Sequence, residues 1–147
     1  MKQVHRGVLG AIIGDIIGSR LEFKRNKEYN FDLFTDANDF TDDTVMTIAE
    51  ADWLTRSETR PVGNDTLPDI MRSWGRKHLW RGYGGMFHRW LVSEYEGDQR
   101  PYNSFGNGAA YYSVPDKIAR KALEYLPEEM VEVLKEFASV VSNNKNK

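Results

Sequence analysis

Apolar residues recur along most of this chain at the three- and four-residue spacing of a helix face, and no stretch alternates as a strand would. The pattern predicts an all-α domain spanning residues 1–147, with loops at 24–40, 56–66 and 93–108 and a polar tail at 143–147. The predicted helices occupy residues 4–22, 41–54, 68–77, 86–92, 116–124 and 128–140. Pro127 divides the last two because proline cannot continue a helix interior.

The first predicted helix is the only place where a membrane span or signal peptide could lie. Its apolar run is interrupted by Asp15, and a carboxylate costs about 2.5–3.5 kcal/mol at the centre of a membrane helix. Gly10, Gly14 and Gly18 fall on one helix face, where they would let another backbone approach closely. We therefore expect a buried helix of a soluble domain, with no membrane association.

Composition narrows the function classes. The 147 residues carry 20 Lys and Arg against 22 Asp and Glu, and a net charge of −2 argues against a strongly cationic nucleic-acid binder. The absence of cysteine excludes a disulfide scaffold, a thiolate nucleophile and a Cys-ligated metal. It also fits a reducing compartment, so we expect a cytoplasmic protein.

The segment Phe40-Thr41-Asp42-Asp43-Thr44 is the sharpest local signal for chemistry. Two adjacent carboxylates and a hydroxyl offer the hard oxygen ligands that Mg²⁺ or Ca²⁺ prefers. Thr and Asp are equally suited to capping a helix, and from this segment alone capping is the favoured interpretation.

Glu22 ends the first predicted helix, where an acidic side chain opposes the helix dipole. Such a placement suggests a metal or another functional partner, although a solvated helix end explains it as well.

Two glycine-rich segments could bind an anion. In the segment 101–110, Gly106-Asn107-Gly108 can direct backbone N–H groups at a phosphate, and Phe105 could stack on a base or sugar. Tyr83-Gly84-Gly85 precedes a predicted helix and has the same low specificity. Either segment taken alone is more often an ordinary surface turn.

The basic stretch between residues 72 and 89 interleaves arginines with Trp74, Trp80 and Trp90. Such a pattern can contact nucleic acid or a phosphate-bearing ligand. We favour a solvated basic face with the aromatic rings turned to the core, with His78 and His88 on that surface and no catalytic dyad among the histidines.

Taken in order, four segments resemble the ADP-ribosylglycohydrolase family. They are Gly10-Ala11-Ile12-Ile13-Gly14-Asp15-Ile16-Ile17-Gly18-Ser19 followed by Glu22-Phe23, then Phe40 to Met46, then Tyr83 to Phe87 with Trp90-Leu91, and finally Pro101 to Ala110. The resemblance covers residues 4–110 almost continuously, and residues 110–141 are similar to the C-terminal helices of the family.

The resemblance implies an orthogonal helical bundle whose active site holds a magnesium pair. Such a site cleaves the bond between ADP-ribose and a protein side chain or a small acceptor. By this analogy the metal ligands are Thr41, Asp42 and Asp43, and Glu22 is the catalytic carboxylate at the reacting ribose. The substrate-binding residues implied in the same way are Gly84, Gly85, Ser104, Phe105, Gly106, Asn107 and Gly108.

The chain also departs from the family. The second metal motif of the family, Gly-Gly-Asp-(Ser/Thr)-Asp-Thr, has no counterpart after Gly108. An internal deletion joined near Ala109–Tyr111 would explain the loss of this half of the metal site. The remaining carboxylates would then hold one Mg²⁺ with several waters, or none, and catalysis would be impaired.

Two further expectations follow from the departure. Helices that had packed on the missing part would expose apolar faces, so the chain is expected to self-associate. The functional alternatives are a reduced hydrolase acting on an ADP-ribosylated protein or small ADP-ribosyl substrate, an inactive module that binds ADP-ribose or a protein, and a remnant without a ligand.

Overall fold

The computed structural model describes residues 3–22, 30–59, 66–93 and 123–143, and these ranges contain helices and no strand. The elements are α1 (Gln3–Glu22), α2 (Asp42–Thr59), α3 (Leu67–Lys77), α4 (Gly85–Val92), a 3₁₀ turn η1 (Leu123–Tyr125) and α6 (Glu128–Asn143). The all-α class is confirmed, and the orthogonal arrangement of the helices stays a prediction.

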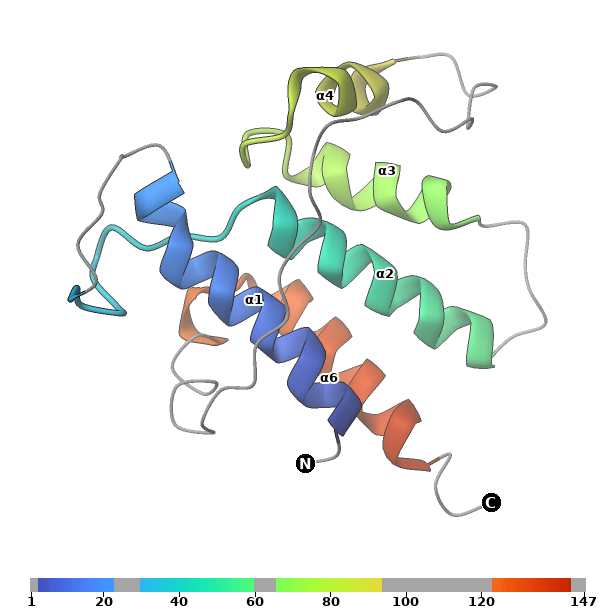
Figure 1. Cartoon of the computed structure of the whole chain (residues 1–147). Coiled ribbons are helices and arrows are strands. Elements are labelled where there is room, and N and C mark those ends of the chain that lie inside the picture. The colour runs from blue at the N-terminus through green and yellow to red at the C-terminus, as the bar shows by residue number, and fades with distance from the viewer. Residues whose placement is uncertain (1–2, 23–29, 60–65, 94–122, 144–147) are drawn as a thin grey trace.

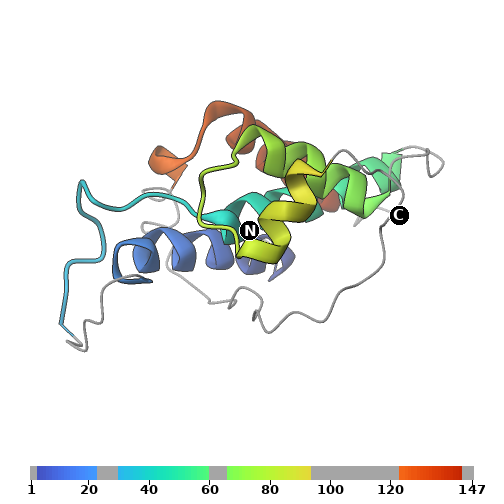
Figure 2. The ribbon, with the colours of Figure 1, turned by 90° about the horizontal axis from the view of Figure 1, so that it is seen from above.

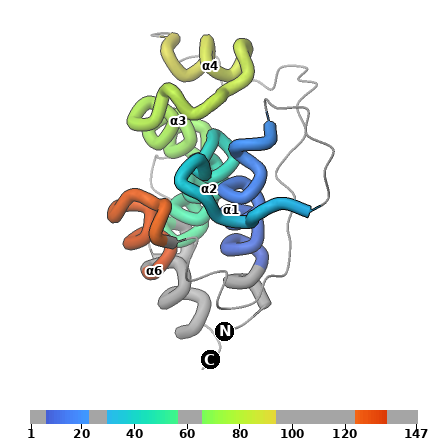
Figure 3. The backbone as a smooth tube through the Cα atoms, turned by 90° about the vertical axis from the view of Figure 1, so that its left-hand side faces the viewer, coloured from blue at the N-terminus to red at the C-terminus, as the bar shows by residue number. Residues whose placement is uncertain are grey.

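Helix α2 lies at the centre of the arrangement. It packs against α1, α3 and α6, whereas α4 packs on α3 at one end (Figures 1 and 3). The connection at residues 30–41 projects to one side of the helices before it returns to the start of α2 (Figure 2). Consequently the N-terminus of α2 lies where this connection, α1 and the α3–α4 connection meet.

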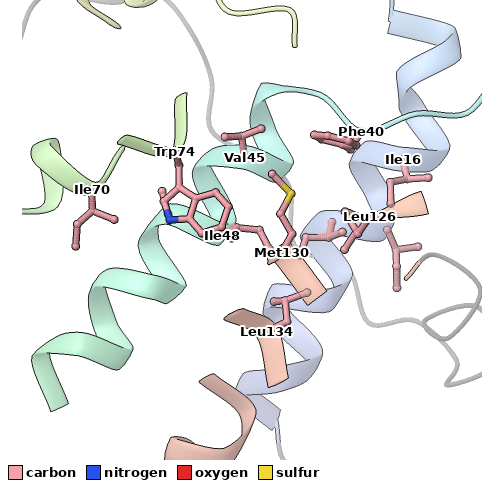
Figure 4. Packing of buried hydrophobic residues seen from close by; sticks show 12 residues of the cluster. Ile16, Phe40, Val45, Ile48, Ile70, Trp74, Leu126, Met130 and Leu134 are labelled. Carbon is pink, nitrogen blue, oxygen red and sulfur yellow. The ribbon is translucent and has the colours of Figure 1, made fainter. Parts of the chain in front are cut away.

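The hydrophobic core is built from side chains of α1, α2, α3 and α6 (Figure 4). Ile16 of α1, Val45 and Ile48 of α2, and Met130 of α6 are fully buried. Trp74 of α3 is 5% exposed and joins the same cluster. The helical spacing seen in the sequence therefore matches the faces that these helices bury.

Helix α2 continues to Thr59, five residues beyond the predicted end at residue 54. Thr55 is buried and its hydroxyl donates to the carbonyl of Ala51. Arg56 forms an ion pair with Asp52 one turn earlier at 2.7 Å. These local contacts carry the helix into a stretch whose composition is typical of turns.

The basic stretch differs in part from the prediction. Trp74 is buried as expected, but Trp80 is 89% exposed. Arg72 is buried rather than solvated, with its guanidinium 4.6 Å from the centre of the Trp90 ring. His78 is not on a solvated surface either, because its ring packs against Trp74 and Phe40.

Some expectations lie outside the described residues. They are most of the predicted helix at 116–124, the proposed join near residues 109–111 and the tail at 144–147. Asn143, where the polar tail was expected to begin, is the last residue of α6.

None of the helices in the described ranges combines the length and hydropathy that a membrane span requires.

Candidate active site at the start of α2

The connection that leads into α2 is attached to the C-terminal half of α1. The buried amide of Asn38 donates to the carbonyl of Ile16 at 2.7 Å. The backbone N–H of Asp39 donates to the hydroxyl of Ser19 at 3.1 Å, and this hydroxyl donates in turn to the carbonyl of Ile16. These bonds bring the start of α2 to the side of α1 that carries Asp15.

Asp15 caps α2 from a different helix. Its Oδ2 accepts the backbone N–H of Thr41 at 2.8 Å and that of Thr44 at 3.2 Å. Both threonine hydroxyls also donate to this carboxylate, at 2.5 Å. An acceptor of this kind satisfies N–H groups that a helix start leaves without partners. Asp15 thus supplies a cap for α2, while Asp42 and Asp43 lie in the first turn of the helix, where their charges also complement the helix dipole.

Asp42 and Asp43 belong to a group of mutually repelling carboxylates. Burial and the negative charges of Asp43, Glu22 and Asp15 together raise the pKa of Asp42 to about 6, against a lowering by a hydrogen bond from its own backbone N–H. Burial and then Asp15 raise the pKa of Asp43 above its ordinary value. Burial and the charges of Asp15 and Asp43 raise the pKa of Glu22 above its ordinary value. The end of α1 and the start of α2 thus concentrate negative charge.

No cationic side chain of the described residues neutralises this group. The cationic side chains of these ranges pair elsewhere, Arg56 with Asp52, Arg81 with Asp39 and Lys135 with Glu132. Carboxylates that repel one another without a cationic partner are a donor set that a divalent cation would stabilise.

The fit to a metal ion has a limit. Within the described ranges, no three His, Cys, Asp or Glu side chains are grouped closely enough to hold a metal by themselves. A cation here would need Asp42, Asp43, the Thr41 oxygen and waters, a mixed set that Mg²⁺ accepts. The Thr41 hydroxyl gives its proton to Asp15 and so keeps its lone pairs available.

The α3–α4 connection borders the same site. The backbone N–H of Asp42 donates to the carbonyl of Arg81 at 2.7 Å. Tyr83 follows Arg81 by two residues. Burial and the charge of Asp42 raise the pKa of Tyr83 well above its usual range. The Tyr83 hydroxyl is buried and has no hydrogen-bond partner among the described residues. An unpaired buried hydroxyl is costly, so this one offers a donor for a bound molecule or water.

Gly84 and Gly85 end this connection and begin α4. Gly84 is the N-cap of α4 and Gly85 its first residue, and both are exposed. A Cβ built at either position meets no described atom beyond its own chain neighbours within 4 Å. Among the described residues, Gly82 has a positive φ of 94°, a backbone conformation that favours glycine. Ser104, Phe105, Gly106, Asn107 and Gly108 lie outside the described residues.

The structure places several of the predicted site residues near one another. Glu22, Asp42 and Asp43 are close enough to influence one another electrostatically, and Thr41 adjoins them. Sequence reasoning missed Asp15 and Arg81, which hold the start of α2. A lone carboxylate in an apolar helix was a usable signal for Asp15, because such a group needs a partner. Arg81 had no comparable signal.

Comparison with known proteins places the chain in a family. The model of the ADP-ribosylglycohydrolase family matches residues 2–144. Neither curated protein sequences nor solved structures yielded a match. A match over nearly the whole chain agrees with the all-helical fold and the four ordered motifs. The chain belongs to the ADP-ribosylglycohydrolase family.

Proposed function

We propose that this protein hydrolyses the glycosidic bond between ADP-ribose and a protein side chain or small acceptor, in a reaction that depends on Mg²⁺. Family membership supports the class of reaction. The proposal places the reaction at the N-terminus of α2, where Asp42 and Asp43 lie within electrostatic influence of Glu22. We also propose the cytoplasm as its location and self-association as its solution state.

The observation that carries the proposal is the family match over residues 2–144, and the raised pKa of three carboxylates near the start of α2 supports the choice of site. Each is raised by burial and by the charge of at least one other acidic residue. Folding therefore gathers negative charge that would be more stable apart, and a bound cation would offset this repulsion.

The residues of the site have different proposed roles. Asp42, Asp43 and the hydroxyl of Thr41 would hold one Mg²⁺ together with waters, and Asp15 orients Thr41 through its hydrogen bond. Bound Mg²⁺ supplies electrophilic polarisation of a substrate oxygen or lowers the pKa of a water. Glu22, exposed at the end of α1, would face the ribose and accept a proton from the attacking water.

The experiment measures release of free ADP-ribose from ADP-ribosylated arginine and serine peptides, with Mg²⁺ or with chelator. We expect release with Mg²⁺ only, and its loss in Asp42→Asn and Asp43→Asn. Asp36→Asn is the matched control, since Asp36 is an exposed aspartate of the connection before α2. Absence of release from every peptide in both conditions contradicts the proposal.

A second candidate is binding of ADP-ribose without hydrolysis. It is favoured by the lack of a three-residue metal group in the described ranges. Calorimetric titration with ADP-ribose separates the two candidates, because a binding module gives heat of binding but no release from modified peptides. A titration without heat contradicts this second candidate.

A further inference from the structure

Arg81 contacts two consecutive residues that lead into α2, Asp39 and Phe40, and also Asp42, which begins the helix. Its carbonyl accepts the backbone N–H of Asp42 at 2.7 Å. Its Nη1 donates to Oδ2 of Asp39 at 2.5 Å and lies 3.4 Å from the carbonyl of Phe40. The guanidinium also lies over the Phe40 ring, 3.6 Å from the centroid. The side chain and the backbone carbonyl of Arg81 thus hold residues 39–42 together.

The position of Arg81 is set by the elements around it. It follows the C-cap residue of α3, His78, by three residues, and Gly82 after it takes a positive φ of 94°. Only glycine adopts that conformation readily, so the chain turns directly after Arg81 toward α4. The contacts of Arg81 therefore connect a turn outside α2 to the residues at its N-terminus.

These contacts are better suited to positioning than to stability. The Arg81 side chain is 28% exposed and that of Asp39 62%, and an ion pair so exposed contributes little to stability. The stacked guanidinium and the short backbone bond instead fix the direction in which the chain enters α2. A small displacement there moves the Asp42 carboxylate with its backbone.

We propose that Arg81 is a positioning residue, which fixes Asp42 at the candidate metal site through the backbone of residues 39–42. The proposal rests on the proposed function, in which Asp42 holds Mg²⁺. Asp15 holds the first turn of α2 from α1, and Arg81 holds it from the α3–α4 connection. Arg81 does not touch the substrate in this proposal, so its role is separate from that of Glu22.

The test compares Arg81→Met with Arg76→Met. Arg76 is a matched control, because its guanidinium also donates two hydrogen bonds to backbone carbonyls, at 2.7 Å to Leu91 and 2.9 Å to Ser93. Those bonds hold the end of α4 instead of the start of α2. Two quantities are measured: Mg²⁺ affinity by calorimetry with the metal alone, and hydrogen exchange of the Asp42 amide in metal-free protein.

We expect Arg81→Met to bind Mg²⁺ about 10-fold more weakly, as loss of a residue supporting a metal ligand commonly does. The Asp42 amide should exchange faster in the same variant, because its bond to the Arg81 carbonyl is no longer held in place. Arg76→Met should retain the parental values of both. Arg81→Lys should give values of both quantities between those of wild type and Arg81→Met. Lysine can pair with Asp39 but lacks the planar group that stacks on Phe40.

The two readouts separate this proposal from the proposed function. Wild-type protein that binds no Mg²⁺ contradicts the metal site, and unchanged Asp42 exchange in Arg81→Met contradicts the positioning role whether or not metal binds. Faster exchange with unchanged Mg²⁺ affinity overturns the link between Arg81 and the metal site. If Arg81→Met does not fold, the same two measurements on Arg81→Lys decide the matter.

Discussion

The carboxylate of Asp15, in the middle of α1, accepts both the backbone N–H and the hydroxyl of Thr44 in the first turn of α2. Helix capping is usually a local arrangement between residues a few positions apart, but these two are 29 positions apart. The bond pair is therefore a tertiary contact that joins two helices and defines where α2 begins.

Asp15→Asn should destabilise the protein by about 2 kcal/mol, the upper range for loss of a helix cap. The amide has one accepting oxygen in place of two, so the donors of Thr41 and Thr44 cannot all be satisfied. Urea unfolding followed by circular dichroism measures the change. Asp36→Asn, at an exposed position, should leave stability within about 0.5 kcal/mol of wild type.

The same substitution tests the electrostatics of the site. The charge of Asp15 raises the pKa of Asp42, Asp43 and Glu22, so its removal should lower all three toward their ordinary values. Carbon-detected NMR titration of the side-chain carboxyls follows each group. Unchanged pKa values of both Glu22 and Asp43 in Asp15→Asn would contradict the influence of Asp15 on these carboxylates.

Trp74→Phe should cost about 1–3 kcal/mol, because it removes the donor to a buried carboxylate. The indole N–H of Trp74 donates to Oδ2 of Asp52 at 2.8 Å, and Asp52 is 6% exposed. Trp80→Phe is the matched control, since Trp80 is 89% exposed and the change should stay within about 0.5 kcal/mol. Equal losses in the two variants would contradict a role for the Asp52 bond.

The sequence pattern predicts helices well and their tertiary contacts poorly, for a physical reason. The apolar face of α1, with Ile12 and Ile16, repeats at helical spacing and is buried as that spacing predicts. Asp15 breaks the same face, and only the fold reveals that its partners are in α2. Trp80 shows the converse error, because periodicity alone does not reveal that its ring lies at the surface beside His88 and is 89% exposed.

The glycines of the helices illustrate the same point. Gly18 belongs to the stripe expected to permit close backbone approach, yet a Cβ built there meets no described atom beyond the adjoining part of α1 within 4 Å. Gly75, which carried no such expectation, is the tightly packed one. A Cβ on Gly75 would lie 2.5 Å from Cδ2 of Leu91, which is fully buried.

Gly75→Ala and Gly18→Ala should therefore change stability in opposite directions. Alanine in a helix is favoured over glycine by roughly 0.5–1 kcal/mol, and Gly18→Ala should gain that amount. Gly75→Ala should lose about 1 kcal/mol or more, because overpacking against Leu91 outweighs the helix gain. Thermal and urea unfolding report both. Adding Leu91→Val to Gly75→Ala should recover part of the loss, and a stabilised Gly75→Ala would contradict the packing described for α3 and α4.

His78 should make folding stability fall as the solution is acidified. Burial lowers the pKa of His78 below its ordinary value of 6.5, Arg81 and Lys77 lower it further, and Glu129 of α6 opposes them. Below about pH 6.5 the unfolded chain therefore binds a proton at His78 that the folded chain does not, so stability is lost until the pH passes the folded pKa. The raised carboxylates at the start of α2 act in the opposite direction.

His78→Phe isolates the contribution, because phenylalanine can pack between Trp74 and Phe40 but does not titrate. Urea unfolding between pH 7.5 and 5 should show a shallower loss of stability on acidification in this variant than in wild type. Glu129→Gln should steepen the loss, since it removes the carboxylate that raises the pKa of His78. The carboxylates near α2 are common to all three proteins, so their contribution cancels in the comparison. Identical slopes in wild type and His78→Phe would show that His78 titrates alike in the folded and unfolded chains, against the burial seen between α3 and α6.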